Sequence, residues 1–182
     1  MRFRMQELTK IIEAEPLAEP KLPWKKIGAW GIGGMRAIGY SDCSRFIIVE
    51  TSEGRGLFDC QTGDKVLRDR NEYKNQEIEL LCEGFGPLVG RTIRMSGLCG
   101  GGLPLSTKDG WHIEIISSWP KNEILLFEPG SSIFGWKYGK PSHFQKIWSG
   151  HEIRGCGFSY SGNTLCIGES SDLVIYSRGA GC

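Results

Sequence analysis

The sequence has almost no net charge and no long apolar run. Its 22 Lys and Arg balance 21 Asp and Glu to a formal charge of +1, so no broad basic surface is available to release counterions from nucleic acid. It also lacks the run of about 18 apolar residues that a membrane-spanning helix needs. Neither general nucleic-acid binding nor a membrane-spanning helix is therefore expected.

Close cysteine pairs are missing too. The seven cysteines include no Cys-x-x-Cys pair, and their odd number does not suit a secreted disulfide framework. We expect reduced, mostly buried thiols. The first residues contain two arginines with no apolar segment behind them, so no signal peptide is expected. These patterns favour a cytoplasmic protein.

Glycine and aromatic residues are abundant instead. The 182 residues include 26 Gly, 6 Trp and 8 Phe, a mixture typical of turn-rich β architecture. Short apolar runs recur between turn signals and predict strands. The clearest of these runs are 45–49, 113–116, 124–127 and 172–176.

The first residues predict a helical arm. Apolar side chains recur at helical spacing over 4–14, and the prolines from Pro16 to Pro23 keep the chain extended after it. We expect an arm and Pro-rich linker over 1–23, followed by a single β domain over 24–182.

A hairpin pattern occurs three times in this β domain. A serine-containing turn precedes an apolar strand at Ser44 and again at Gly162. The same 14 positions separate each of these residues from an aromatic residue in the next strand, Phe58 or Tyr176. A looser copy begins at Gly110. Evenly repeated hairpins are typical of propellers and related arrays.

The last copy resembles a blade of a WD40-type β-propeller. Gly150-His151, the Ser161-Gly162 turn and Asp172 follow one another before Tyr176, and Phe58-Asp59 in the first copy is similar to the aromatic-Asp ending of such blades. The resemblance implies that His151 and Asp172 belong to a structural hydrogen-bond network within the blade.

The number of hairpins limits the architecture. A blade takes roughly 40 to 45 residues and closed propellers usually need about four blades, whereas this chain has room for three. The expected fold is all-β: a propeller-like array of antiparallel hairpins, open or incomplete, with a short N-terminal helix. A three-sheet array and a β-sandwich stay open as alternatives.

Two glycine-rich stretches fail the tests for nucleotide binding. In Gly31-Ile32-Gly33-Gly34, Arg36 stands where a dinucleotide fingerprint needs its third glycine, and residues 99–104 lack the Lys-Ser/Thr of a phosphate-binding loop. Both are interpreted as turns. A solvated charged turn is expected where acidic and basic residues are interleaved, at Asp64, Lys65, Arg68, Asp69, Arg70 and Glu72.

Catalytic chemistry has weak support. Cys99 would be a nucleophile if His112 lay beside it, but free cysteines usually pack as small apolar residues. His112, His143 and His151 have no Cys or carboxylate at ligand spacing. No metal, cofactor or catalytic residue is therefore predicted, and a small cysteine-dependent or hydrolytic enzyme is the alternative.

Basic and aromatic residues are interleaved between 136 and 148. Packing within strands is the first interpretation of these rings, and binding follows because Trp, Tyr and Arg dominate protein interfaces. Single-stranded nucleic acid would also stack on them, but the near-zero charge favours a protein. The predicted protein-binding residues are Trp136, Tyr138, Lys140, Phe144 and Trp148, with Arg91 in the 82–104 loop.

We expect a non-enzymatic protein-binding module. The specific hypothesis is an immunity-type inhibitor that binds and neutralises a toxin, because a small domain without evident chemistry would act by covering a surface of its target. A structural subunit that completes a larger propeller by homo-oligomerisation is a further alternative.

Overall fold

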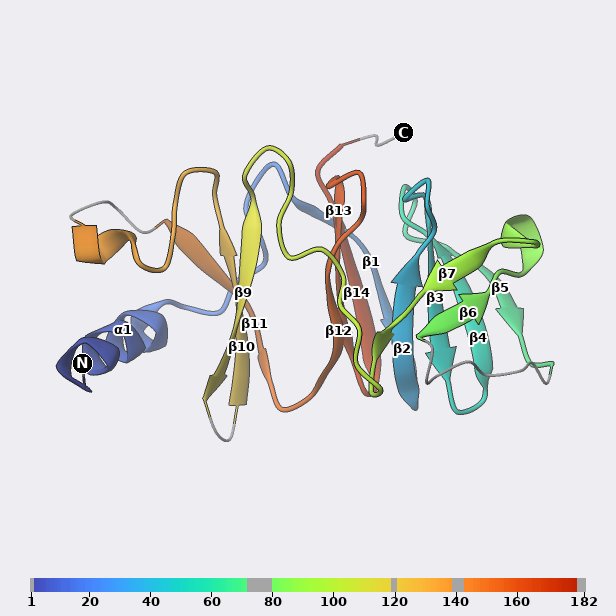
Figure 1. The fold of residues 1–182 in the computed structure, drawn as a ribbon, viewed down its shortest axis with the longest axis horizontal. Helices are drawn as coiled ribbons and strands as arrows, with labels where there is room; N and C mark the ends of the chain where they lie inside the picture. The colour runs from blue at the N-terminus through green and yellow to red at the C-terminus, as the bar shows by residue number, and fades with distance from the viewer. Residues whose placement is uncertain (1, 72–79, 119–120, 139–142, 180–182) are drawn as a thin grey trace. The chain divides into compact units, whose positions relative to one another are not determined.

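The computed structural model describes residues 2–71, 80–118, 121–138 and 143–179 (Figure 1). They form mostly β-strands, arranged in several antiparallel sheets, and one short α-helix. The all-β class and the N-terminal helix are thus confirmed.

The chain divides into two compact units. Unit 1 combines Met1–Pro20 with Lys108–His151, and unit 2 combines Lys21–Thr107 with Glu152–Cys182. The expected boundary between residues 23 and 24 separates an arm from a β domain, whereas these units each contain strands. The single β domain over 24–182 stays a prediction.

Unit 1 is built on a three-stranded sheet of order β11-β10-β9. Its elements are α1 (Arg2–Ala14), β9 (His112–Ser118), β10 (Lys121–Phe127), η3 (Gly135–Tyr138) and β11 (Phe144–Gly150). The helix packs against the sheet because Ile12 lies in one buried cluster with Leu125, Phe127 and Ile133. Ile12 of the helical stripe predicted over 4–14 thus faces a core, with Leu8 packed against it, whereas Ile11 is exposed.

After α1, the proline-containing segment lies alongside β11. Leu17 forms a parallel bridge to Lys146, and the Ala18 amide donates to the Lys146 carbonyl at 3.0 Å. The Lys146 ammonium lies 3.0 Å from the Glu123 carboxylate, with both side chains largely buried. The arm is therefore attached to the sheet of its own unit.

Unit 2 contains two larger sheets. The four-stranded sheet has the order β1-β14-β13-β12 and the five-stranded sheet the order β5-β4-β3-β2-β8 (Figure 1). The strands of the first are β1 (Lys25–Gly31), β12 (Ile153–Phe158), β13 (Thr164–Glu169) and β14 (Asp172–Ser177). The strands of the second are β2 (Met35–Tyr40), β3 (Phe46–Thr51), β4 (Gly54–Asp59), β5 (Lys65–Asp69) and β8 (Ser96–Gly97).

A buried cluster joins these two sheets. Ile38, Val49 and Phe58 of the five-stranded sheet pack with Cys166 and Leu173 of the four-stranded sheet. A second cluster covers the other face of the five-stranded sheet, where Ile48 and Leu57 meet residues from a two-stranded sheet. That small sheet pairs β6 (Leu81–Glu83) with β7 (Thr92–Arg94), which are linked through η2 (Gly86–Leu88).

The two predicted hairpin turns of unit 2 have the same hydrogen bonds. The Ser41 hydroxyl accepts from the Phe46 amide at 3.0 Å, and the Ser159 hydroxyl accepts from the Thr164 amide at 3.2 Å. Ser44 and Gly162 occupy equivalent places with φ of 62° and 77°. Three residues after each, Ile47 pairs with Phe58 and Leu165 pairs with Tyr176. The common register predicted from the 14-residue spacing is confirmed.

The equivalence extends to one end strand of each sheet, β5 and β1. β5 pairs with β4 with a register shift opposite Leu57 and Phe58. β1 pairs with β14, and its shift lies between Lys26 and Gly28. Each strand therefore has one extra residue, Val66 or Ile27, just after a lysine. The third predicted hairpin is present in unit 1 as β9 and β10, where His112 pairs with Phe127.

The cysteines divide into buried and exposed thiols. Cys60, Cys82, Cys156 and Cys166 are buried, Cys43 and Cys99 are exposed, and none of these six described cysteines forms a disulfide. Burial raises the pKa of the Cys166 thiol to about 12 and raises the pKa of Cys156. A hydrogen bond with the Ser41 hydroxyl lowers the pKa of Cys43.

Iodoacetamide at about pH 8 is expected to alkylate Cys43 and Cys99 at least about tenfold faster than Cys156 and Cys166, because only an accessible thiolate reacts. Peptide mass spectrometry of timed samples measures each rate, with a urea-unfolded sample as the control for intrinsic reactivity. Equal rates for Cys43 and Cys166 in the native protein would contradict the burial described here.

Candidate functional site

The residues expected to form a solvated charged turn form strand β5. Lys65, Val66, Leu67 and Arg68 are all exposed, while Asp69 at the end of the strand is half-buried. The prediction of a turn was wrong because β4 supplies a hydrogen-bonding neighbour that no local propensity reveals. Glu72 lies outside the described residues.

A β-bulge sets the direction of the two basic side chains in β5. Successive side chains of a regular strand alternate between its faces, so residues three apart would point to opposite sides. Here Lys65 pairs with Phe58 and Arg68 pairs with Gly56, two residues apart on β4, because Val66 is the extra residue. Lys65 and Arg68 therefore lie on the same face of the sheet.

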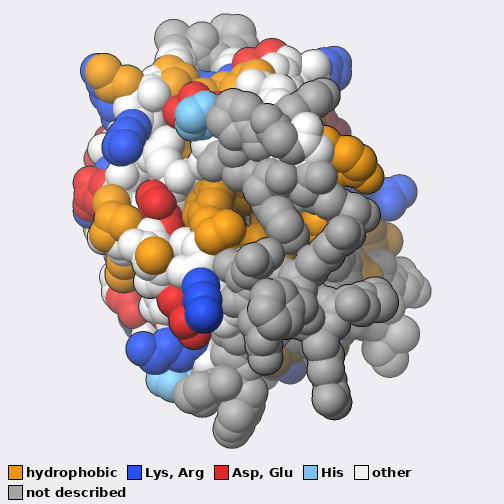
Figure 2. Space-filling model, turned by 90° about the vertical axis from the view of Figure 1, so that its left-hand side faces the viewer, with side chains coloured by type: hydrophobic (Ala, Val, Ile, Leu, Met, Phe, Trp, Pro, Cys, Tyr) orange, Lys and Arg blue, Asp and Glu red, His pale blue; other side chains and the backbone are white. Residues whose placement is uncertain are grey.

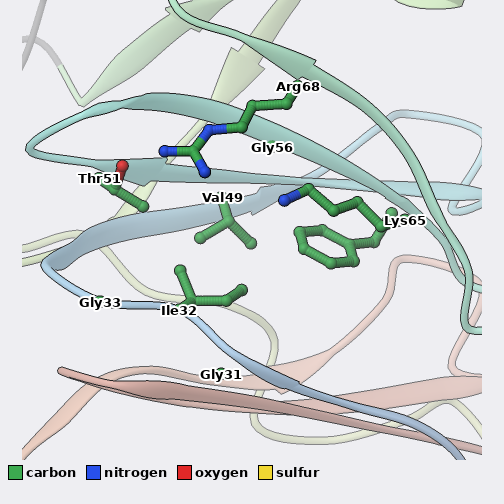
Figure 3. A pocket seen from close by; sticks show the side chains of 9 residues that line it. Gly31, Ile32, Gly33, Val49, Thr51, Gly56, Lys65 and Arg68 are labelled. Atoms are coloured by element: carbon green, nitrogen blue, oxygen red, sulfur yellow. The ribbon is translucent and has the colours of Figure 1, made fainter.

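This face borders a cavity of about 80 Å³ in unit 2. Val49 and Phe58 form an apolar wall, and Ile32 contributes from the turn between β1 and β2. Lys65 and Arg68 extend over the same space (Figure 3). The residues that complete the lining are Gly31, Gly33, Thr51 and Gly56.

The β1–β2 turn leaves the cavity accessible. A Cβ added at Gly31 or Gly33 would meet no atom within 4 Å, so the backbone passes the cavity without filling it. The turn is held in place by hydrogen bonds from the amides of Ile32 and Met35 to the carbonyls of Ser171 and Ser170. The glycine-rich stretch is thus a turn, as predicted, and one that lines a cavity.

The cavity has a positive electrostatic character. No Asp or Glu is among its lining residues, and no ion pair joins Lys65 or Arg68 to a carboxylate within the described ranges. The Lys65 ammonium lies 5.9 Å from the centre of the Phe58 ring, a favourable cation–π distance. The site therefore combines two cations with an apolar wall.

A buried arginine anchors β5 from the opposite face. The Arg55 guanidinium forms an ion pair with Asp69, donates to the Glu83 carbonyl at 2.6 Å and lies 4.6 Å from the centre of the Phe85 ring. Since these contacts join β4, β5 and the β6–β7 segment, they fix the strand that presents Lys65 and Arg68.

The predicted protein-binding residues of unit 1 lie in different environments. Tyr138 is exposed at the end of η3, while Trp148 is buried and Phe144 packs on Phe127 with 5.3 Å between ring centres. Trp136 lies in η3, and Lys140 is outside the described residues. Phe144 and Trp148 thus have the packing role that was their first interpretation, and a binding role stays a prediction.

The described apolar side chains on the left-hand side of the molecule are partly visible in Figure 2. Figure 2 shows hydrophobic side chains in separate groups with acidic and basic side chains between them. The exposed apolar residues of unit 1 include Ile11, Leu17, Ile115 and Phe134. This pattern gives no continuous docking face on the visible described atoms.

Arg91, His151 and Asp172 are exposed. Arg91 lies in unit 2, with its guanidinium 3.8 Å from the Asp42 carboxylate. The His151 carbonyl accepts from the Asn122 side chain at 2.7 Å, and the Asp172 carboxylate accepts from the Ser171 hydroxyl. His151 belongs to unit 1 and Asp172 to unit 2, so their shared network stays a prediction.

The catalytic alternative pairs residues from the two units. Cys99 is exposed in unit 2, and His112 in unit 1 stacks on Phe127 with 4.7 Å between ring centres. Among the described residues, no group of three His, Cys, Asp or Glu side chains is arranged to hold a metal ion. Within the same ranges, no helix has the length and apolarity to cross a bilayer.

No protein-family model matches the chain, and no curated protein matches its sequence. The local geometry of unit 2 is therefore the basis for a functional interpretation. Within it, the cavity beside β5 combines open space, the half-buried side chain of Ile32 and two exposed cations.

The two end strands share one sequence feature, a lysine before the extra residue. Lys65 in β5 and Lys26 in β1 each precede it, but β1 comes before both hairpins and β5 follows the first of them, so aligning the hairpins does not reveal β5. The bulge that turns Arg68 towards the cavity has no sequence signature of its own.

Proposed function

We propose that the chain is a non-enzymatic protein-binding module that adds an extended segment of another protein to the free edge of β5. The observation that supports it is the position of β5 at the end of its sheet, where no described strand pairs with its outer side. An exposed strand edge offers backbone donors and acceptors that a peptide can continue.

The exposed side chains of β5 favour a binding edge. Its short length, Lys65 and the bulge at Val66 are features that keep edges from aggregating. Val66 and Leu67, however, are 46% and 41% exposed, and they offer adjacent apolar surface. β1 is also an end strand, but the Gly63 backbone lies against it at Ile27 and Gly28.

Charge favours a foreign segment over a second copy of the chain. Lys65 and Arg68 both border the cavity beside β5, so pairing two β5 edges would bring four cations into one region, where like charges oppose association. An acidic segment would be attracted instead. A homodimer through β5 is the outcome that would replace this proposal.

We further infer that the two large sheets of unit 2 are successive blades of a propeller-like array. Their equivalent turns at Ser41 and Ser159 support this, as does the extra residue in β1 and in β5. The lack of disulfides among the six described cysteines supports a cytoplasmic location. None of these residues indicates that the partner is a toxin, so the proposal is limited to protein binding.

Strand addition can be tested with peptides. Peptides selected from a displayed library against the folded chain should perturb the amide resonances of 65–69. The backbone N–H groups of a bound strand point alternately to its two sides, so only every second one donates to β5. Methylating the nitrogens that face β5 should therefore weaken binding at least about tenfold, whereas methylating the other set should not.

The control compares two exposed valines in the protein. Val66→Ser removes an apolar contact from β5 and should weaken peptide binding, while Val89→Ser, at an exposed site outside β5, should leave it unchanged. Failure to select any peptide, equal effects of methylating the two sets of nitrogens, or a dimer that forms through β5 in light scattering would each overturn the proposal.

A further inference from the structure

We infer that the cavity beside β5 takes a carboxylate side chain of glutamate type from the segment that pairs with this strand. The inference rests on the proposed function for the origin of the ligand. Its chemistry is set by the cavity itself, whose lining among the described residues contains two cations and no carboxylate.

The cavity suits a short chain with a charged end. Its volume of about 80 Å³ corresponds to between two and three water molecules at liquid density. Ile32, which is half-buried, offers apolar contact to methylene groups above the buried Val49, while Lys65 and Arg68 reach over the same space (Figure 3). A glutamate side chain presents both parts in that order.

The cavity lies beside β5, the strand to which the partner segment is proposed to add. Two of the lining residues, Lys65 and Arg68, belong to β5 itself and lie on one face because of the bulge at Val66. A paired segment would direct alternate side chains to that face. The bulge would thus set which position of the segment must be acidic.

Binding should depend on the geometry of the two cations. An arginine can bind a carboxylate with two parallel hydrogen bonds, and a lysine acts as a point charge. Arg68 would orient the carboxylate, and Lys65, positioned over the Phe58 ring, would add attraction. Both side chains are exposed, so salt should weaken the interaction.

Glutarate is the first probe, because it has the chemistry of the side chain without a peptide backbone. Titration into the full chain should shift the NMR resonances of the Ile32 and Val49 methyl groups in a saturable way. Lys65→Gln and Arg68→Gln should each weaken binding several-fold, and the double variant at least about tenfold. Arg70→Gln, which removes an exposed charge outside the lining, is the matched control.

Two results would overturn the carboxylate assignment. One is glutarate binding that Lys65→Gln and Arg68→Gln leave unchanged, or no binding at all. The other is tighter binding of inorganic phosphate, measured as displacement of glutarate at a phosphate concentration below the one at which glutarate half-saturates the site. That result would assign the cavity to a phosphate group.

The peptide arm separates this inference from the proposed function. Replacing one glutamate by glutamine in a peptide that binds β5 should weaken its binding to the natural chain at least about tenfold. The same replacement should weaken binding to the Arg68→Gln variant much less. Glutarate binding without any β5 peptide would retain the anion site and reject strand addition. Peptide binding that is indifferent to the glutamate would retain strand addition and reject this inference.

Discussion

Asp69→Ala is expected to lower the free energy of unfolding by about 3 kcal/mol, because removing one member of a buried ion pair leaves the other charge uncompensated. The Arg55 and Asp69 side chains are only 6% and 12% exposed, so water cannot readily replace the lost carboxylate. Asp69 also accepts from the Asn71 amide at 2.9 Å. Urea unfolding followed by tryptophan fluorescence measures the change.

The matched control removes a neighbouring carboxylate. Asp64 is exposed just before β5, and Asp64→Ala should change stability by less than about 0.5 kcal/mol. Combining Arg55→Met with Asp69→Leu should recover much of the loss, since apolar pairs can replace buried ion pairs. Equal effects of Asp69→Ala and Asp64→Ala would contradict the role assigned to the Arg55 cluster.

The effect of Asp69→Ala should also depend on pH. Hydrogen bonds from the Asn71 amide and Arg55 lower the pKa of the Asp69 carboxyl in the folded state. Its ionised form therefore stabilises the fold above the unfolded-state value of about 3.9, and this contribution disappears as pH falls through the lower folded value. The stability difference between the natural chain and Asp69→Ala should shrink on acidification below about pH 4.

Gly63→Ala is expected to destabilise unit 2 by about 3 kcal/mol, from left-handed backbone strain and overpacking together. Gly63 has a φ of +78°, and an added Cβ would lie 2.0 Å from the Ile27 carbonyl oxygen. The Gly63 carbonyl accepts from the Trp30 indole at 2.8 Å. The substitution would thus force the β4–β5 turn away from β1.

Gly90 separates these two costs. It has a φ of +80°, close to that of Gly63, but an added Cβ would meet nothing within 4 Å. Gly90→Ala should therefore lose only the backbone strain, about 1 to 2 kcal/mol. Thermal and urea unfolding of both variants measure the difference, and equal losses would show that the close approach to Ile27 contributes nothing.

Local patterns were enough to predict the hairpins. The Ser-x-x-Ser/Gly turns could be identified because serine side chains and left-handed residues have a direct sequence signature, and the 14-residue spacing gave the register of Phe58 and Tyr176 correctly. Helix α1 followed from its apolar spacing and the proline after it.

Tertiary pairing explains what the sequence did not show. β5 resembles a charged turn when considered alone, and it is a strand because β4 and the buried Arg55 hold it. Trp148 and Tyr138 could not be distinguished by composition, yet one is buried and the other exposed. The cavity depends on the β1–β2 turn and β5, whose approach is a property of the packed sheets.

The pairing of β1 with β14 imposes an order on folding. Lys25 pairs with Ser177 in the β1–β14 ladder, so β1 emerges from the ribosome long before the strand that it pairs with. The five-stranded sheet, whose β2–β5 strands are consecutive, can assemble during synthesis. The four-stranded sheet must wait for the last strand, and pairing over so long a stretch of chain is slow. Nascent β1 therefore lacks its β14 neighbour until Ser177 has been synthesised, and chaperones or other chains can contact it during that time.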